Sequence, residues 1–405
     1  MKKILFFLVL TIIPCFSVPN IFLQITKNFS QKADVVLLYQ LERNNYWKSF
    51  SDTFSRDLYY SGYFNVEEQK FVKDIEKSKS EFPVNIIISL RKEKGGIKVS
   101  VFDNLEEKVL FEKNYMLLKN SRYFAHIVND DIVFALTGKA GIARSKILFV
   151  SDRTGKYQIY TSDYDGENVK QITNFNYLVN FPRWSPDRKS FYFVSYKNGS
   201  PEIERRNLMT GKEETVFEYP GLNACIATCK NKNILGIVLS KSGNPEIYLT
   251  TSDGKIIRKL TNYRGIDSSP SFSPDGEKIT FVSDRYGSPQ IFIMDKDGFG
   301  VRRISYISTY ATCPKWSPDG KYIAYVILKS GFKIAVYDIE TGKTKLLGNS
   351  KGAEAISWAP DSRHIVFSKT DIHPSRLCII DVFTGETRYL TGKGYNSFSP
   401  DWEKF

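Results

Sequence analysis

Carboxylates recur at a regular spacing in the second half of the chain, and carboxylates are common general acids and bases in enzymes. Each belongs to a phrase of the Ser-Pro-Asp type, written WSPD, FSPDG, WSPDG, WAPD and FSPDW, and the acids are Asp187, Asp275, Asp319, Asp361 and Asp401. A catalytic acid is placed once in an active site, whereas a residue that shapes a turn recurs with every repeat. The pattern therefore indicates turns rather than catalysis.

Other side chains with chemical potential are few. The three histidines, His126, His364 and His373, are scattered, and none has a second histidine three or four residues away, as a helical metal site would need. His126 lies in an apolar, helix-periodic segment and is expected to be a hydrogen-bonded structural residue. The Gly95-Gly96 pair lacks a phosphate-loop pattern. We therefore expect no enzyme activity, no metal and no cofactor.

The recurring carboxylates must be positioned by a repeated structural unit. The repeated turns start at residues 185, 229, 273, 317, 359 and 399, where the copy at Cys229 has lost its Ser-Pro-Asp letters. Within each unit, four short runs of alternating apolar residues are separated by Gly-, Pro- and Asp-rich turns, which is typical of β-strands. Four strands in roughly 40–45 residues predict the blade of a β-propeller.

The ends of the repeat region predict the number of blades. Residues 146–173 supply the last three strands of a unit but lack the first, and Asn396–Phe405 supplies a first strand with no others. Joining them makes one composite blade, which removes the open sheet edges of an unclosed array. The five complete blades are predicted at 181–217, 225–260, 269–304, 313–347 and 355–390, so the ring has six.

The start of the chain reads as an export signal. Lys2 and Lys3 precede the apolar run Ile4–Ile13, and Pro14 breaks it. Ten apolar residues are about half of what a membrane-spanning helix needs. Residues 1–17 are therefore predicted to be a signal peptide, and the mature chain from Val18 is expected to be exported and not membrane-spanning.

Residues 18–140 show no repeat and are predicted to form an α+β domain, with helices on one side of a small mixed sheet. A linker at 141–145 and the propeller at 146–405 follow. The predicted strands are 33–41, 84–90 and 97–102, and the predicted helices are 46–61 and 123–136.

The cysteines and the net charge indicate how the chain is stabilised and which kinds of partner it can bind. The cysteines after the signal have no framework spacing and are expected to be free, buried thiols: Cys225, Cys229, Cys313 and Cys378. The net charge of the whole chain is +13, but the basic residues are scattered rather than clustered. This pattern argues against a nucleic-acid partner and favours acidic partners or an anionic envelope surface.

The order of these features carries a family resemblance over the whole mature sequence. It runs through the helix ending at Thr137-Gly138, the segment Lys139–Arg144, the strand Ile147–Val150, the phrase Ser162–Gly166 and the terminal Trp402 after six repeats. In this order they resemble the TolB family, the periplasmic propeller proteins of the Tol–Pal system. The resemblance implies a monomeric, non-catalytic scaffold that supports outer-membrane integrity and constriction at cell division.

The resemblance also implies two protein partners. The peptidoglycan-associated lipoprotein, Pal, would bind at the mouth of the propeller. The inner-membrane protein TolA would bind the mature N-terminal segment, at Val18, Asn20, Ile21, Phe22, Leu23 and Ile25.

Propeller geometry suggests which residues surround the mouth. The first strand of each blade lies nearest the axis, so the loops that enter first strands surround the opening of the channel. Counting five to seven residues back from each turn gives the predicted partner-binding residues Val179, Asn180, Leu222, Asn223, Ala224, Asp267, Ser268, Tyr310, Ala311, Thr312, Ala353, Glu354 and Lys393.

Two other functions stay open from the residues alone. A periplasmic hydrolase or lyase would need convergent carboxylates at the mouth, and Asp267 with Glu354 is the pair that the sequence offers. A polyanion-binding lectin would use the net charge of +9 on residues 144–405.

Overall fold

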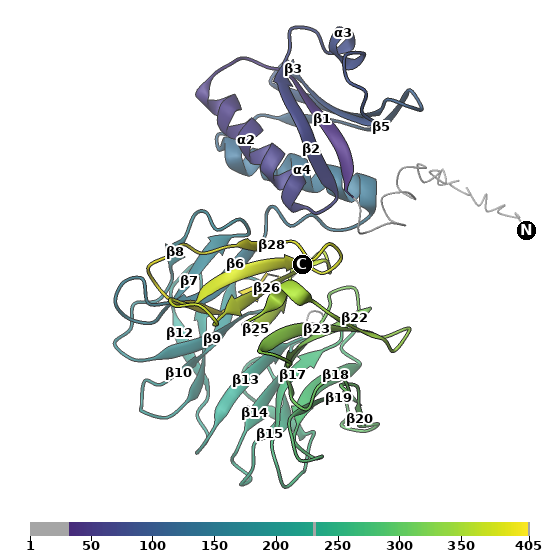
Figure 1. Cartoon of the computed structure of the whole chain (residues 1–405). Coiled ribbons are helices and arrows are strands. Elements are labelled where there is room, and N and C mark those ends of the chain that lie inside the picture. The colour runs from purple at the N-terminus through teal and green to yellow at the C-terminus, as the bar shows by residue number, and fades with distance from the viewer. Residues whose placement is uncertain (1–31, 230–231, 404–405) are drawn as a thin grey trace, which may run out of the picture.

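Two regions of different secondary structure follow one another in the computed structural model, which describes residues 32–229 and 232–403 (Figure 1). The predicted signal peptide and the predicted partner-binding residues 18–25 lie outside the described residues. Among the described residues, no helix combines the length and hydrophobicity needed to span a bilayer.

The first region is a five-stranded mixed sheet in the order β2-β1-β3-β4-β5. Strand β1 pairs parallel with β2 and β3, while β3, β4 and β5 pair antiparallel. The sequence predicted β1, β3 and β4 but missed β2 and β5, because these edge strands lack a buried apolar run: only Phe64 in β2 and Tyr115 in β5 are buried. The strand bounds are β1 Ala33–Gln40, β2 Phe64–Phe71, β3 Ile86–Glu93, β4 Gly96–Asp103 and β5 Lys108–Met116.

Two long helices cover one face of this sheet, and a short helix, α3 (Ile75–Lys79), contributes Ile75 to a small apolar cluster with β1 and β3. Helix α2 (Asn45–Tyr60) begins where the Asn44 side chain accepts a hydrogen bond from the Trp47 backbone N–H at 3.0 Å. Helix α4 (Ser121–Thr137) ends at Gly138, whose φ of 66° suits a glycine. The apolar faces of α2 and α4 form one core with the sheet.

The second region consists of six four-stranded sheets arranged as a ring of blades (Figure 1). We number blade 1 as the composite of β29 (Ser397–Trp402) with β6 (Lys146–Ser151), β7 (Gln158–Asp163) and β8 (Lys170–Gln171). Blade 2 contains β9 Val179–Trp184, β10 Ser190–Ser195, β11 Glu202–Asn207 and β12 Glu213–Phe217. Blade 3 contains β13 Asn223–Thr228, β14 Ile234–Leu239, β15 Glu246–Thr251 and β16 Ile256–Lys259.

The other three blades follow the same pattern. Blade 4 contains β17 Asp267–Phe272, β18 Lys278–Ser283, β19 Gln290–Asp295 and β20 Arg302–Arg303. Blade 5 contains β21 Ala311–Trp316, β22 Tyr322–Leu328, β23 Phe332–Asp338 and β24 Thr344–Leu346. After a short 3-10 turn at Gly348–Ser350, blade 6 contains β25 Ala353–Trp358, β26 His364–Lys369, β27 Arg376–Asp381 and β28 Thr387–Tyr389.

The last strand closes the ring. Strand β29 pairs antiparallel with β6, with Ser397 opposite Ser151 and Trp402 opposite Ile147. In Figure 1 the yellow C-terminal segment accordingly lies within the first blade. The predicted α+β domain followed by a closed six-bladed propeller is thus confirmed.

Each inner strand contains a β-bulge at the same position. At each bulge one non-glycine residue adopts the left-handed conformation, with φ between 46° and 53°: Phe181, Cys225, Ser269, Cys313, Ala355 and Ser399. Proline follows four of these residues, at Pro182, Pro270, Pro314 and Pro400. A bulge interrupts the ladder, so a residue without an N–H donor is tolerated there.

The bulge corrects the alignment of the final repeat. In the FSPDW phrase, Pro400 is the bulge proline, equivalent to Pro182, and Trp402 is equivalent to Trp184. The sequence alignment had instead matched Ser399 to the turn serines. The final Ser-Pro-Asp sequence is therefore shifted by four residues relative to the turn sequences of the other blades, because Ser-Pro-Asp lies in a strand here and in a turn there.

Candidate protein-binding site

The N-terminal region packs against one face of the propeller and leaves the opposite face open. Its contacts reach the turn after β7 at Asp165, the turn after β25 at Arg363 and the turn after β27 at Glu386. These turns connect first to second and third to fourth strands, so they share one face of the ring. The loops that enter inner strands and the turns from second to third strands form the other face, which we call the mouth face.

A buried hydrogen-bonded group joins the two regions. The Asp57 carboxylate in α2 lies 2.6 Å from Nδ1 of His126 in α4 and accepts a hydrogen bond from the Tyr164 hydroxyl of the propeller. Burial raises the pKa of Asp57, and its contacts with His126 oppose that shift. His126 is 3% exposed, and its Nε2 has no hydrogen-bond partner. The histidine has the structural role expected of it through Nδ1.

An ion-pair group lies beside it. The Asp165 carboxylate contacts the guanidinium groups of Arg122 and Arg56, the latter at 2.8 Å. Burial alone would raise the pKa of Asp165, but the hydrogen bond and charge of Arg122 outweigh burial and lower it below its ordinary value. These contacts fix the N-terminal region against blade 1.

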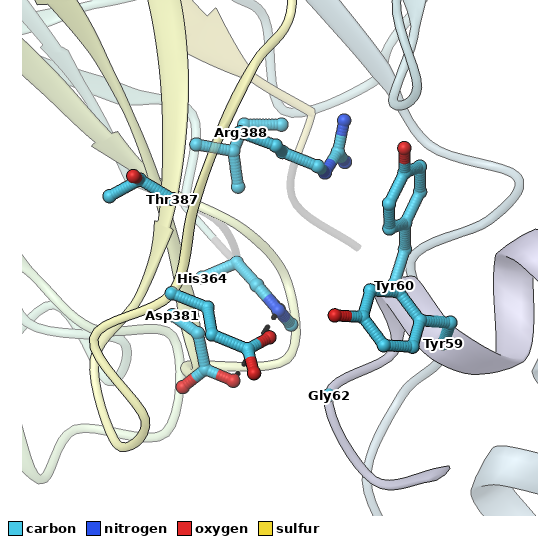
Figure 2. Close-up of a pocket in the computed structure, with 9 residues that line it drawn as sticks. Tyr59, Tyr60, Gly62, His364, Asp381, Thr387 and Arg388 are labelled. Atoms are coloured by element: carbon cyan, nitrogen blue, oxygen red, sulfur yellow. Dashed lines mark ion pairs between the residues drawn. The ribbon is translucent and has the colours of Figure 1, made fainter. Parts of the chain in front are cut away.

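A cavity of about 180 Å³ separates α2 from blade 6 (Figure 2). Tyr59 and Tyr60 face Arg388, His364 and Asp381 across it. The Arg388 guanidinium lies 4.1 Å from the centroid of the Tyr60 ring, and burial lowers its pKa. Nearby, Arg363 forms a buried ion pair of 2.7 Å with Asp381. These interactions hold the domain junction together and contain no nucleophile positioned beside a base.

The structure divides the predicted mouth residues into two groups. One group is buried, so its side chains position the inner strands instead of facing a partner: Val179, Asn223, Ala224, Asp267, Ala311 and Ala353. Asn223, for example, donates to the carbonyl oxygens of Pro201 and Tyr219. The other group is half-buried or exposed: Asn180, Leu222, Ser268, Tyr310, Thr312, Glu354 and Lys393.

Lys393 is not equivalent to the other mouth residues. It was counted back from residue 399, which is a bulge position rather than a turn. Strand β29 begins at Ser397, so Ser397 and Phe398 occupy the positions that Val179 and Asn180 hold in blade 2. Lys393 lies in the loop before β29.

The carboxylate pair considered for catalysis is not brought together. Asp267 is buried in blade 4 and forms an ion pair of 3.1 Å with Arg285, while Glu354 lies in blade 6 and accepts a hydrogen bond from Thr370. Burial raises the pKa of Asp267, and the contacts with Ser283 and Arg285 oppose that shift. Neither side chain has the partner that a two-carboxylate mechanism requires.

A hydrolase-like G-x-S-x-G pattern occurs at Gly348–Gly352. It forms a 3-10 turn leading into β25 rather than a strand–turn–helix elbow. The Ser350 hydroxyl is buried, accepts from the Ile334 N–H and donates to the Leu347 carbonyl. It closes blade 5 and is not exposed as a nucleophile would be.

Exposed apolar side chains gather on the mouth face. Among the described residues, eight large apolar side chains are exposed there, compared with three on the turns of the opposite face, Met209, Phe299 and Val301. The eight are Tyr157, Leu178, Phe181, Ile266, Tyr286, Tyr306, Ile307 and Leu328. The sequence-based prediction included none of these eight residues. It marked only positions five to seven residues before each turn, whereas Tyr157, Tyr286 and Leu328 lie at the turns between second and third strands and the others lie elsewhere in the entry loops or at a bulge.

Five of the eight form a connected group at blades 4 and 5, which we call the apolar patch: Ile266, Tyr286, Tyr306, Ile307 and Leu328. Their loops are tied together by hydrogen bonds, from Ser288 Oγ to the Thr309 carbonyl at 2.6 Å and from Ser308 Oγ to the Leu328 carbonyl at 2.8 Å. The Ile266 N–H donates to Asp284 Oδ1 at 2.9 Å. Preorganised, exposed aromatic side chains are typical of protein-binding surfaces.

None of the four cysteines in the described residues forms a disulfide. Cys229 and Cys378 are buried as expected, but Cys225 and Cys313 are half-buried, because both lie at bulges of inner strands. No group of three or more His, Cys, Asp or Glu residues in the described ranges is arranged to hold a metal ion.

Comparisons with known proteins agree with this architecture. A family model described as the TolB β-propeller domain matches residues 133–405. The crystal structure of TolB from Acinetobacter baumannii superposes with a TM-score of 0.80 at 25% identity, covering 92% of this chain and 96% of that one.

Two curated relatives match over shorter lengths. A "Protein TolB homolog" of Chlorobium chlorochromatii is 38% identical over 44% of this chain and 40% of its own length. A "Tol-Pal system protein TolB" of Desulfosudis oleivorans is 34% identical over 42% of this chain and 39% of its own length. The matches thus span about two fifths of these relatives. The family model and the full-length structural match show that the chain belongs to the TolB β-propeller family.

Proposed function

We propose that this protein is a non-catalytic scaffold of the Tol–Pal system in the periplasm. In this role it binds Pal through the mouth face and supports outer-membrane integrity and constriction at cell division. Membership of the TolB family and the name of the Desulfosudis oleivorans relative support the system.

The observation that carries the proposal is the asymmetry between the two faces of the propeller. One face is occupied in part by the N-terminal region, through the buried groups around Asp57 and Asp165. The opposite face presents the apolar patch, in which Tyr286 and Tyr306 are 70% and 71% exposed. The apolar surface of such side chains is buried when a protein docks on them. In many interfaces a few buried aromatic residues supply most of the binding free energy.

The half-buried and exposed residues at the strand entries extend the proposed contact towards the axis. Asn180, Ser268, Thr312 and Glu354 occupy equivalent positions in four blades, directly before the bulge residue of each inner strand. They would supply polar contacts around the channel opening, while the patch supplies the apolar contacts.

Binding of the mature chain to the soluble domain of Pal, measured by isothermal titration calorimetry, tests this proposal. We expect the double substitution Tyr286→Ala with Tyr306→Ala to weaken binding roughly tenfold or more, as interface aromatics commonly do. The matched control, Met209→Ala with Phe299→Ala, removes equally exposed apolar side chains from the opposite face and should leave the affinity unchanged. Equal effects of the two double variants would refute the assignment of the face.

We propose a second contact, between TolA and the mature N-terminal segment that includes Ile21, Phe22 and Leu23. The support is family membership together with the apolar letters of this segment. A mature chain that begins at residue 32 should still bind Pal but lose binding to TolA in the same assay. Retained binding to TolA would contradict this contact.

A further inference from the structure

The N-terminal region exposes apolar side chains along one edge of its sheet. Among residues 32–145, eight large apolar side chains are exposed, and all but Tyr59 lie on β5, on the segments that flank β5 or on helix α4. These seven are Leu105, Val109, Met116, Leu117, Leu118, Tyr123 and Phe134. Tyr59 instead faces the cavity at the domain junction (Figure 2). Contiguous exposed apolar surface on a folded domain commonly marks a binding site.

Strand β5 is an open edge of the sheet. It pairs with β4 along one side, and no strand in the described part of the chain pairs with its other side. The backbone N–H and C=O groups along that side therefore have no partner in the sheet. A row of such groups next to apolar side chains matches the chemistry of an extended peptide, which supplies both backbone hydrogen bonds and side chains.

The opposite edge of the sheet lacks this combination. Strand β2 pairs with β1, and its exposed residues, 67–70, are all polar or charged. Charged side chains on an edge strand hinder pairing with other chains. Strand β5 instead exposes Val109 and Met116, which are 50% and 84% exposed. The apolar surface is thus confined to one of the two edges.

Helix α4 lies beside the edge of β5. The Asp131 carboxylate of α4 accepts a hydrogen bond from the Tyr115 hydroxyl of β5 at 2.9 Å. Residues spaced from Asp131 by three or four positions, or by two such steps, share its helix face: Phe134, Ile127 and Tyr123. Phe134 and Tyr123 are 62% and 49% exposed. A strand added to β5 would therefore also contact this apolar face of α4.

A second copy of this chain fits the edge poorly. Two β5 strands related by a twofold axis would pair antiparallel, with one residue opposite its own copy. Glu112 is the central residue of β5, so the register that pairs all nine residues places Glu112 opposite Glu112. Like charges directly opposite one another destabilise a strand pair. A strand of different sequence is therefore favoured.

The charges at the end of β5 favour an acidic partner. The Leu117 N–H donates to the Gly95 carbonyl at 3.3 Å, so the turn before β4 adjoins this end of the edge. Glu93, Lys94 and Lys119 are exposed there, and none of the three forms an ion pair with another described residue. Two lysines against one glutamate leave this end positive, which attracts a negatively charged group.

We propose that the open edge of β5 binds an extended segment of another protein as an added strand. The segment would carry apolar side chains at alternate positions, which face α4, and an acidic residue near Lys119. Its backbone hydrogen bonds would supply affinity, and the alternate side chains would supply specificity. The contact involves neither the mouth face nor residues 18–25, so it does not depend on the proposed function.

Selection from a phage-displayed library of random dodecapeptides on the mature chain tests the proposal, with the affinities of synthetic copies measured by fluorescence polarisation. We expect peptides with alternating apolar residues, whose binding Val109→Glu weakens roughly tenfold or more because an unpaired charge enters an apolar contact. Gln69→Glu is the matched control, because it adds the same charge to the exposed edge β2. It should change the affinity by less than about twofold.

Two results of this experiment would overturn the site. If no selected peptide depends on Val109, the edge does not bind extended segments. If Gln69→Glu weakens binding as much as Val109→Glu does, the effect arises from net charge.

A second variant guards against loss of the fold. Phe134→Ala removes an exposed side chain from α4, so it should leave the melting temperature within about 1 °C of the parent and still weaken peptide binding roughly threefold or more. Unchanged affinity would remove α4 from the site and contradict the proposal.

N-methylated peptides test strand addition itself. Alternate N–H groups of an added strand point towards β5, and the others point away. Methylation of every second peptide nitrogen should therefore abolish binding in one phase and be tolerated in the other. Equal losses in both phases would show that the peptide does not bind as a strand.

The same variants distinguish other occupants of the edge. A concentration-dependent dimer of the mature chain that Val109→Glu abolishes in analytical ultracentrifugation would assign the edge to a second copy. Peptide binding by a chain that begins at residue 32, but not by the mature chain, would assign it to residues 18–31 of the same chain. Either result would overturn the proposal, whereas a monomeric mature chain that binds the peptides supports it.

Discussion

Replacing Trp402 tests the closure of the ring most directly. The side chain is fully buried and packs with Ile147, Phe149 and Tyr164 at the seam between the last and first strands of the propeller. Its indole N–H donates to Ser145 Oγ at 2.7 Å, between residues 257 positions apart in the chain. Trp402→Ala therefore removes both the packing and the hydrogen bond that hold β29 in place.

The size of the effect follows from the burial. Truncating a buried tryptophan to alanine costs about 3–5 kcal/mol of unfolding free energy, through lost burial and the cavity left behind. Trp402→Phe keeps most of the ring and loses chiefly the hydrogen bond, which costs about 1 kcal/mol. With a shift of about 2–4 °C for each kcal/mol in a domain of this size, the melting temperature should fall by roughly 10 °C for alanine and roughly 3 °C for phenylalanine.

Differential scanning calorimetry of the mature chain at pH 7 measures both shifts, with Met209→Ala as the surface control. Met209 is 88% exposed, so its variant should melt with the parent protein. A fall in the melting temperature of less than about 3 °C for Trp402→Ala would contradict the reasoning, because removal of a buried side chain that closes the ring should destabilise the fold by more than that. Equal losses for alanine and phenylalanine would assign the whole effect to the hydrogen bond and refute the packing argument.

Three further predictions concern the domain junction and the bulges. Gly62 has a φ of 81°, and a Cβ there would lie 2.3 Å from Arg363 Nε, so Gly62→Ala should destabilise the junction by about 2 kcal/mol and speed limited proteolysis between the domains. Burial alone would raise the pKa of the Asp381 carboxyl group, but the contacts with His364 and Arg363 outweigh burial and lower this pKa below 3.8. The ionised Asp381 therefore contributes its full stabilisation of the folded state above pH 3.8, and this contribution is lost as the pH falls through the lowered pKa. Asp381→Asn should cost about 3–5 kcal/mol at pH 7, and the gap between the urea midpoints of variant and parent should narrow as the pH falls below 3.8 through the lowered pKa. Cys313 has a φ of 51°, so Cys313→Val should cost about 1–3 kcal/mol in thermal unfolding while Cys313→Gly does not, and a tolerated valine would show that the bulge is not strained.

The architecture was predictable because its turns recur in the sequence. Steps of about 44 residues between Ser-Pro-Asp phrases reflect a four-stranded unit, and the unmatched ends at 146–173 and 396–405 predicted the composite blade. The register of the final repeat was not predictable from its residue types alone. In the phrase that begins at Trp184 the proline shapes a turn, whereas Pro400 lies in a bulge, and the difference depends on which hydrogen bonds the backbone makes.

The candidate site was predictable only in outline. The position of the mouth follows from the order of the strands, but alternation along an inner strand decides that Asn180 is partly accessible and Val179 is not. The apolar patch was missed because exposure of Tyr286 depends on how neighbouring loops pack. The junction around Asp57 joins residues 69 and 107 positions apart and has no periodic signal in the sequence.

The seam between β29 and β6 sets the order in which the molecule folds. Strands joined by short turns can zip together locally, whereas β29 must find a partner more than 240 residues away in the chain. Closing a loop of that length costs about 3 kcal/mol more in chain entropy than closing a short hairpin turn. Blades 2 to 6 can therefore assemble while blade 1 still has an unpaired edge. That interval, before the final strand docks, is when the nascent molecule is most open to aggregation and to capture by chaperones.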